Sequence, residues 1–86
     1  MSFVKIGAEK ECAGSELIRE YYENVKECAQ SCYGKSSVFI FGEHDNIHGR
    51  CKGDPLKCRC LCETAADSDG KCSTVDYFAS SMYKYV

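Results

Sequence analysis

Several short stretches of the 86-residue chain alternate apolar and polar residues with a period of two. The alternation is strictest in Lys57–Glu63 and is also visible in Phe3–Ile6, while Ser37–Phe41 is rich in β-branched and aromatic residues. Such stretches are typical of strands, in which successive side chains point to opposite faces. The segments Asp76–Phe78 and Met82–Val86 have the composition of a last strand. We therefore predict that these stretches form a sheet.

One helix is predicted before the aromatic strand, and two start points fit the pattern. Ser15 could cap a long helix with an apolar stripe. Alternatively, Asn24 and Glu27 form a capping box that begins a short helix over about residues 25–33. The capping box is the stronger local signal, so the second reading is favoured and leaves Leu17–Tyr22 extended.

Glycine, proline and clusters of polar residues mark the predicted connections. Gly7 is expected to end the first strand. Gly53–Pro55 is expected to form a turn between a short strand at Arg50–Lys52 and the alternating segment that follows. The polar segments Glu43–Gly49 and Thr64–Lys71 read as surface loops.

Eight cysteines in 86 residues is the density of a disulfide scaffold. A hydrophobic core alone is thin at this length, and small domains are often cross-linked for that reason. We expect a single domain over residues 1–86, an oxidising compartment outside the cell, and no free thiol. The cysteines expected in disulfides are Cys12, Cys28, Cys32, Cys51, Cys58, Cys60, Cys62 and Cys72.

The sequence CRCLC at residues 58–62 places three cysteines on one face of the alternating strand. Neighbours on that face lie about 6.6–6.8 Å apart, at the outer limit for a disulfide, so they need partners on another element. Cys28 and Cys32 are four residues apart on one helix face, with an axial rise of about 6 Å. The two spacings nearly match, which favours two disulfides between helix and strand.

The remaining cysteines can then pair without leaving any over. Cys51 lies across the predicted turn from the strand and is expected to take its third cysteine. Cys12 and Cys72 are expected to join the two ends of the domain. Eight cysteines allow 105 pairings, so this scheme is a geometric preference among many.

A soft-metal site is the alternative use of these cysteines. Closely spaced cysteines such as Cys28 and Cys32 bind zinc, and His44 and His48 could add imidazoles. However, the chain is 44% hydrophobic and has no clean pair of Cys-x₂-Cys knuckles. We therefore expect no metal and no cofactor, and we read the histidines as loop residues.

The formal net charge of −2, with both signs spread along the chain, argues against nucleic acid or an anionic membrane as the main partner. The longest apolar run, Val38–Phe41, is far too short to span a bilayer. Met1–Lys5 lacks the apolar run of a signal peptide, and we expect a mature secreted form that carries an initiator Met.

The order of these features resembles the PAN/apple domain family over roughly residues 3–86. A helix with Glu27–Cys32 precedes the strand Val38–Gly42, a Gly49–Cys51 element, the cysteine-rich strand, and Cys72 before the aromatic ending Ser81–Val86. The resemblance implies an α+β domain in which a curved antiparallel sheet cradles one helix and disulfides pin the helix to the central strands. It also implies no catalytic chemistry and a role in binding proteins or carbohydrates outside the cell.

This chain departs from the family at one cysteine position. The family usually has a cysteine just before the aromatic strand, where this chain has Ser36-Ser37-Val38. The departure affects the disulfide connectivity more than the fold.

The first functional hypothesis is a secreted, non-catalytic recognition module that binds an extracellular protein or carbohydrate. Its candidate ligand-binding residues form a dense run of polar donors and acceptors between the aromatic strand and Cys51. They are Glu43, His44, Asp45, Asn46, His48 and Arg50. A plain exposed loop is the alternative for the same run.

Two other functions fit a small chain rich in cysteine. One is a secreted signalling ligand, pheromone-like or growth-factor-like, that acts on a cell-surface receptor and self-associates weakly. The other is a protease inhibitor or toxin that uses the segment Lys52–Lys57, although a turn between strands is the simpler interpretation. Because no cysteine is expected to be free for nucleophilic chemistry, we predict that the chain is not an enzyme.

Overall fold

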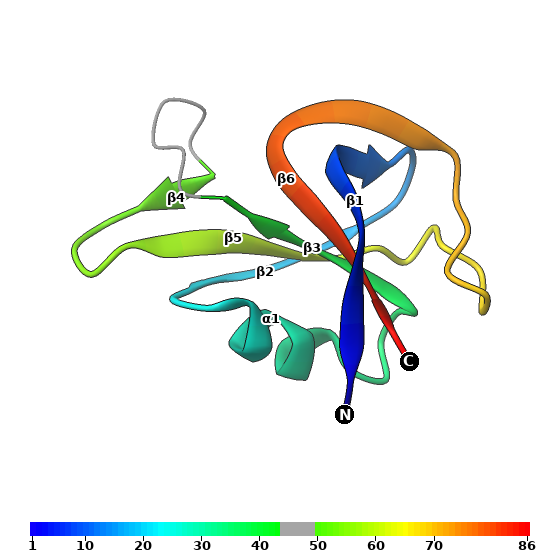
Figure 1. Cartoon of the computed structure of the whole chain (residues 1–86), viewed down its shortest axis with the longest axis horizontal. Coiled ribbons are helices and arrows are strands. Elements are labelled where there is room, and N and C mark those ends of the chain that lie inside the picture. The colour runs from blue at the N-terminus through cyan, green and yellow to red at the C-terminus, as the bar shows by residue number, and fades with distance from the viewer. Residues whose placement is uncertain (44–49) are drawn as a thin grey trace.

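The computed structural model describes residues 1–43 and 50–86, which form six strands and one helix. Every strand pair in these two ranges is antiparallel, and the strands follow the order β1-β6-β3-β5-β2, with β4 paired to β5 (Figure 1). In chain order the elements are β1 (Phe3–Cys12), β2 (Leu17–Tyr22), α1 (Val25–Cys32), β3 (Val38–Gly42), β4 (Cys51–Lys52), β5 (Lys57–Cys62) and β6 (Thr74–Tyr85).

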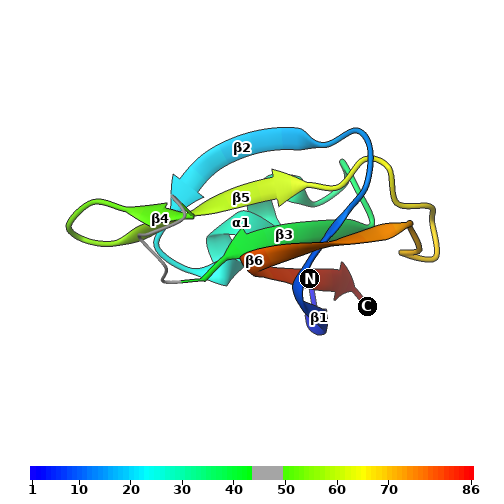
Figure 2. The ribbon, with the colours of Figure 1, turned by 90° about the horizontal axis from the view of Figure 1, so that it is seen from above.

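The helix lies against one face of this sheet, and the opposite face carries no helix in the described part of the chain. Figure 2 looks onto the opposite face, where β2, β5, β3 and β6 run side by side in front of α1. The N- and C-terminal ends lie close together because Phe3 pairs with Tyr85 in the β1–β6 ladder. The α+β expectation is met only in part, since α1 has 8 residues whereas β6 alone has 12. The domain is dominated by its sheet.

The helix-side face of the sheet holds an aromatic and cystine core. Phe39 is fully buried and packs with Cys28, Ala29, Cys32, Cys60 and Cys62. The Phe39 ring stacks on Tyr83 at 5.2 Å and meets the edge of Phe3 at 5.5 Å, with the distances measured between ring centroids. Tyr83 and Tyr85, two residues apart in β6, both pack on this core.

The opposite face holds a second, aliphatic core. Val38 and Ile40 are fully buried there, together with Leu61, Met82 and Cys12. Alternation along β3 therefore sends Val38 and Ile40 one way and its phenylalanines the other, as the sequence pattern predicts.

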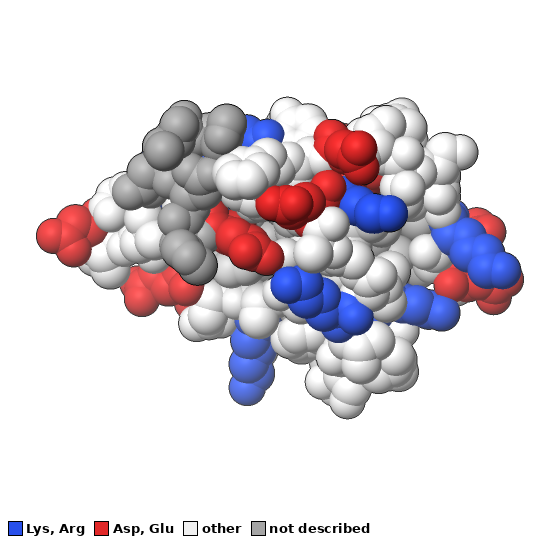
Figure 3. Space-filling view, turned by 45° about the horizontal axis from the view of Figure 1, so that its top comes forward, with Lys and Arg blue, Asp and Glu red and all other residues white. Residues whose placement is uncertain are grey.

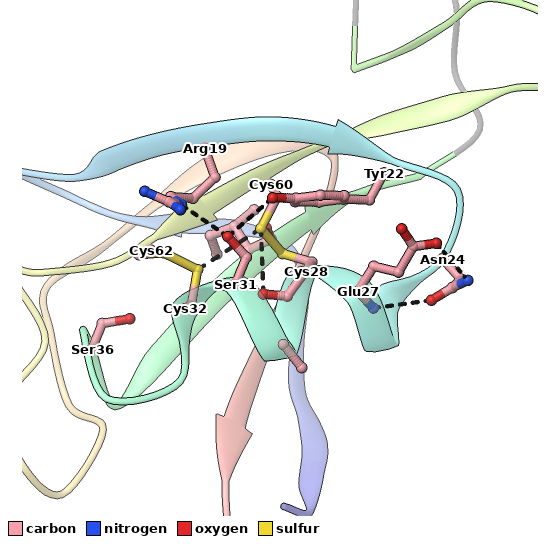
Figure 4. Close-up of a disulfide and its surroundings, with 12 residues drawn as sticks. Arg19, Tyr22, Asn24, Glu27, Cys28, Ser31, Cys32, Ser36, Cys60 and Cys62 are labelled. Atoms are coloured by element: carbon pink, nitrogen blue, oxygen red, sulfur yellow. Dashed lines mark hydrogen bonds between the residues drawn. A yellow bond between two sulfur atoms is a disulfide. The ribbon is translucent and has the colours of Figure 1, made fainter.

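Four disulfides cross-link the elements in the pairing that the spacing favours, and no described cysteine is free. Two of them join the helix to β5, as Figure 4 shows from the side of the helix. The third closes the β4–β5 hairpin, and the fourth joins the end of β1 to the segment before β6. The bonds are Cys28–Cys60, Cys32–Cys62, Cys51–Cys58 and Cys12–Cys72.

The shorter helix reading is confirmed. Asn24 is the N-cap, and its side chain accepts a hydrogen bond from the backbone N–H of Glu27 at 3.0 Å. The helix is also tied to the edge strand β2, because Arg19 and Tyr22 both donate to Ser31 Oγ (Figure 4).

The prediction that Gly7 ends the first strand is wrong. β1 continues to Cys12, and Gly7 follows a register shift where it sits opposite Met82. A second irregularity lies between Ala8 and Lys10, where Glu9 has a φ of 55°. The glycine therefore accompanies a bulge in a long strand rather than a break, which is the other common role of glycine in strands.

Candidate functional site

The structure describes only two of the predicted ligand-binding residues, Glu43 and Arg50. His44, Asp45, Asn46 and His48 lie outside the described residues. Glu43 follows β3, and Arg50 precedes β4. The two side chains lie in different surroundings. Glu43 lines a hollow beside the helix, whereas the guanidinium of Arg50 stacks on the ring of Tyr77 on the face of the sheet away from the helix.

The carboxylate of Glu43 is held in place by its neighbours. Lys5 Nζ lies 3.4 Å from Glu43 Oε1, and the hydroxyl of Ser81 donates to the same oxygen. The backbone is fixed as well, since the Glu43 N–H donates to the Ala79 carbonyl at 2.7 Å. This carboxylate is therefore positioned before any ligand arrives, which reduces the entropy lost on binding.

Glu43 stands at the edge of an open groove of about 490 Å³, named here the aromatic groove. The groove combines ring and aliphatic walls with two carboxylates, one from the start of the helix segment and one from the end of β3. The described residues that line it are Glu23, Val25, Phe41, Gly42, Glu43, Leu56, Cys58 and Tyr83. Its size lies within the range of small-ligand and side-chain sites.

Part of the groove wall belongs to disulfide-linked elements. Cys58 is bonded to Cys51 across the β4–β5 hairpin, and the helix that follows Glu23 is bonded twice to β5. Burial raises the pKa of Tyr83, with Lys5 acting in the opposite direction, so the phenol stays protonated at neutral pH. The groove thus offers a neutral aromatic surface and, at Glu43, a carboxylate acceptor that is held by its neighbours.

Gly42 shows how closely the loop end approaches the sheet. A Cβ at Gly42 would lie 2.9 Å from the carbonyl oxygen of Arg50 and 3.0 Å from its Cβ. The N–H of Arg59 donates to that same carbonyl at 2.6 Å. Only glycine leaves room for this contact, which fixes both ends of the segment that carries the ligand-binding candidates.

Arg50 contributes to a different group of side chains on the face away from the helix. Its guanidinium lies 4.2 Å from the ring centroid of Tyr77, and Arg59 lies 5.5 Å from the same centroid. Arg59 also forms an ion pair with the buried Glu11 at 2.8 Å, and Ser80 donates to the same carboxylate oxygen. Burial raises the pKa of Glu11, and these two partners oppose the shift.

Charges of both signs are mixed over this side of the molecule. Figure 3 shows Lys and Arg side chains interspersed with Asp and Glu, without one large field of either sign. The mixture agrees with the small net charge of −2 and leaves recognition to local groups rather than to a long-range field.

The sulfur atoms of Cys28, Cys32 and Cys60 lie within 4.8 Å of one another, which is a spacing that could suit a metal ion. Each of these atoms is bonded in a disulfide, so none offers a thiolate ligand or a nucleophile. The cluster is therefore a structural one.

In the described ranges, no helix is long and apolar enough to cross a membrane.

Most of the aromatic groove is not predictable from the sequence. Glu43 belongs to the predicted polar run, whereas Val25, Phe41, Leu56 and Tyr83 come from four separate segments. The sequence pattern does indicate the orientation of Phe41 and Tyr83, because alternation places each on the helix-side face of its strand. Their meeting beside Leu56 depends on strand order, which the pattern does not encode.

No protein-family model, no curated protein and no solved structure matches this chain. The assignment of a function consequently depends on the residues and their arrangement.

Proposed function

We propose that this chain is a secreted, non-catalytic recognition module that binds an extracellular protein or carbohydrate. The observation that carries the proposal is the aromatic groove, in which two carboxylates border an apolar hollow on a disulfide-linked frame. Rigid frames with a few fixed polar groups favour binding, because little side-chain and loop entropy is lost.

The chemistry of the groove favours a ligand that combines an apolar surface with hydrogen-bond donors. Sugar rings meet that requirement through their C–H faces and hydroxyl groups. Lysine or arginine side chains of a partner protein meet it through their methylene stems and charged heads. Tyr83 and Phe41 would contact the apolar part, and Glu23 and Glu43 would accept from the donors.

The placement outside the cell is supported by the disulfides. Four cross-links in 86 residues are the pattern of small domains from oxidising compartments. The PAN/apple resemblance forms part of the same proposal, since a sheet pinned to one helix by Cys28–Cys60 and Cys32–Cys62 is the arrangement that the resemblance implies.

The test is a binding screen of the oxidised protein against a glycan array and a library of extracellular protein domains. The double variant E23Q/E43Q removes both groove carboxylates, and Y83L removes the aromatic wall. The charge-matched control E20Q/D69N changes two exposed acids outside the groove. We expect a captured ligand to bind E23Q/E43Q and Y83L about tenfold more weakly and the control as tightly as wild type. The proposal is wrong if no ligand is captured, or if the groove variants bind like the control.

A further inference from the structure

The β4–β5 hairpin carries two lysines that face each other across the ladder. Lys52 and Lys57 are direct partners in the register, and both side chains are exposed. Partners in an antiparallel pair point to the same face, so the two lysine side chains leave the ladder on one side. The adjacent pair in the ladder, Cys51 and Cys58, is joined by a disulfide. This bond holds the lysines together although like charges placed directly opposite each other are unfavourable.

A hollow of about 360 Å³ lies beside these lysines, named here the hairpin hollow. The ring of Tyr21 forms one wall, and Lys52 Nζ lies 4.2 Å from the centroid of that ring. Gly53, Asp54 and Pro55 also line the hollow, and most of the exposed surface of its described lining is apolar. The hollow therefore presents apolar walls with a charged mouth.

Among the described residues that line the hollow, two lysines stand against one acid, Asp54. In the described part of the chain, neither Lys52 nor Lys57 forms an ion pair. The hairpin hollow is also separate from the aromatic groove, because Cys58 and Lys57 are successive strand residues and point to opposite faces.

We propose that the hairpin hollow binds an acidic peptide segment of a partner protein. An aliphatic or aromatic side chain of that segment packs against Tyr21 and Pro55, and a neighbouring carboxylate lies between Lys52 and Lys57. The carboxylate relieves the repulsion between the two ammonium groups. Charge complementarity therefore favours an acidic partner. The apolar walls favour a peptide over a sulfated polysaccharide, whose hydrated anionic groups make little use of such walls. This inference rests on the proposed recognition function but concerns a different surface.

The experiment selects peptides from a display library of random seven-residue sequences. Three oxidised proteins serve as bait, namely the wild type, K52Q/K57Q and the control K26Q/K35Q. Lys26 and Lys35 are exposed and lie outside the hollow, so both variants change net charge equally. We expect the wild type and K26Q/K35Q to enrich Asp or Glu next to Leu, Phe or Tyr, and K52Q/K57Q to lose this enrichment. A synthetic peptide with the enriched sequence should bind K52Q/K57Q about tenfold more weakly than wild type and K26Q/K35Q about equally well.

Three results overturn the inference. The first is an absence of acidic enrichment on wild type. The second is an equal loss of binding in both lysine variants, which shows an effect of net charge alone. The third is binding of heparin at Lys52 and Lys57 without binding of acidic peptides. If the groove variant E23Q/E43Q still loses its captured ligand in any of these cases, only the hairpin inference fails and the proposed function stands.

Two further variants of the hairpin hollow should change the affinity for the acidic peptide in opposite directions. D54N removes the opposing carboxylate and should tighten the binding of the acidic peptide. Y21L removes the aromatic wall and should weaken it, with most of the loss independent of salt. Circular dichroism checks that every variant is folded. The substituted lysines are exposed, so their replacement is not expected to change the fold.

Discussion

The backbone N–H of Cys12 donates a hydrogen bond to Glu63 Oε2 at 2.8 Å, which links the end of β1 to the residue after β5. Glu63 is fully buried, and its other carboxylate oxygen has no hydrogen-bond partner in the described residues. Burial is the main reason why the pKa of Glu63 rises to about 8, and the neighbouring Glu16 adds to the rise. The N–H of Cys12 acts in the opposite direction. At neutral pH this side chain is therefore largely a neutral acid inside the fold.

The raised pKa of Glu63 predicts that the protein is more stable in mild acid. A free glutamate has a pKa near 4.5, so between about pH 4.5 and 8 the folded chain holds a proton that the unfolded chain has lost. Stability is highest below that window and falls as the pH rises through it, by on the order of a few kcal/mol. Urea unfolding at pH 5, 6, 7 and 8 measures the slope.

The variant E63Q separates this effect from the other carboxyl groups. Glutamine keeps an oxygen that can accept from the Cys12 N–H but cannot ionise, so E63Q should be more stable than wild type at pH 8 and should lose much less stability than wild type from pH 5 to 8. The exposed control E20Q should keep the wild-type slope. A steep fall in the stability of E63Q over the same range would show that another group titrates.

Removal of single disulfides should destabilise the protein in an order set by loop length. Cys12–Cys72 spans 60 residues, Cys28–Cys60 spans 32, and Cys51–Cys58 spans 7. In the chain-entropy model, the paired serine variants lose roughly 4 kcal/mol for the first two and roughly 2 kcal/mol for the hairpin bond. Thermal unfolding of the three paired variants ranks them. A larger loss for the hairpin variant than for C12S/C72S would contradict the entropic account.

Replacement of the helix cap should cost a measurable fraction of the stability. N24A removes the oxygen that accepts from the Glu27 N–H, and the loss should be about 1 kcal/mol. N24D keeps an acceptor at the same place and should stay within a few tenths of wild type. Chemical unfolding compares the two, and equal losses would mean that the cap oxygen contributes nothing.

The parts of the fold that could be predicted from sequence are those with a short, strict period. The cysteines at 58, 60 and 62 match Cys28 and Cys32 because a two-residue step in a strand and a four-residue step in a helix have nearly equal lengths. The capping box at Asn24 depends on only four residues, so local chemistry was enough to find it.

The parts that could not be predicted depend on which strands become neighbours. Glu63 ends the alternating stretch Lys57–Glu63, and nothing in that pattern predicts its burial, yet it is fully buried beside the end of β1. Both hollows likewise combine residues from segments far apart in the chain, such as Tyr21 with Lys52. Sequence periodicity gives the face of a residue but not the element that lies over that face.

The bend in β1 predicts that a glycine at position 9 will stabilise the chain. Glu9 has a φ of 55° at an irregularity of the β1–β6 ladder, and its side chain is exposed, so little packing is lost on its removal. A left-handed conformation costs a residue with a Cβ more than it costs glycine, and this gain exceeds the entropy cost of glycine. We expect E9G to raise the free energy of unfolding by about 0.5–1 kcal/mol. E20G, in the extended edge strand β2, should lower it by a similar amount, because only the entropy cost applies there. Urea unfolding of both variants at one pH gives the two signs, and a loss of stability in E9G as large as in E20G would show that β1 is not bent at this residue.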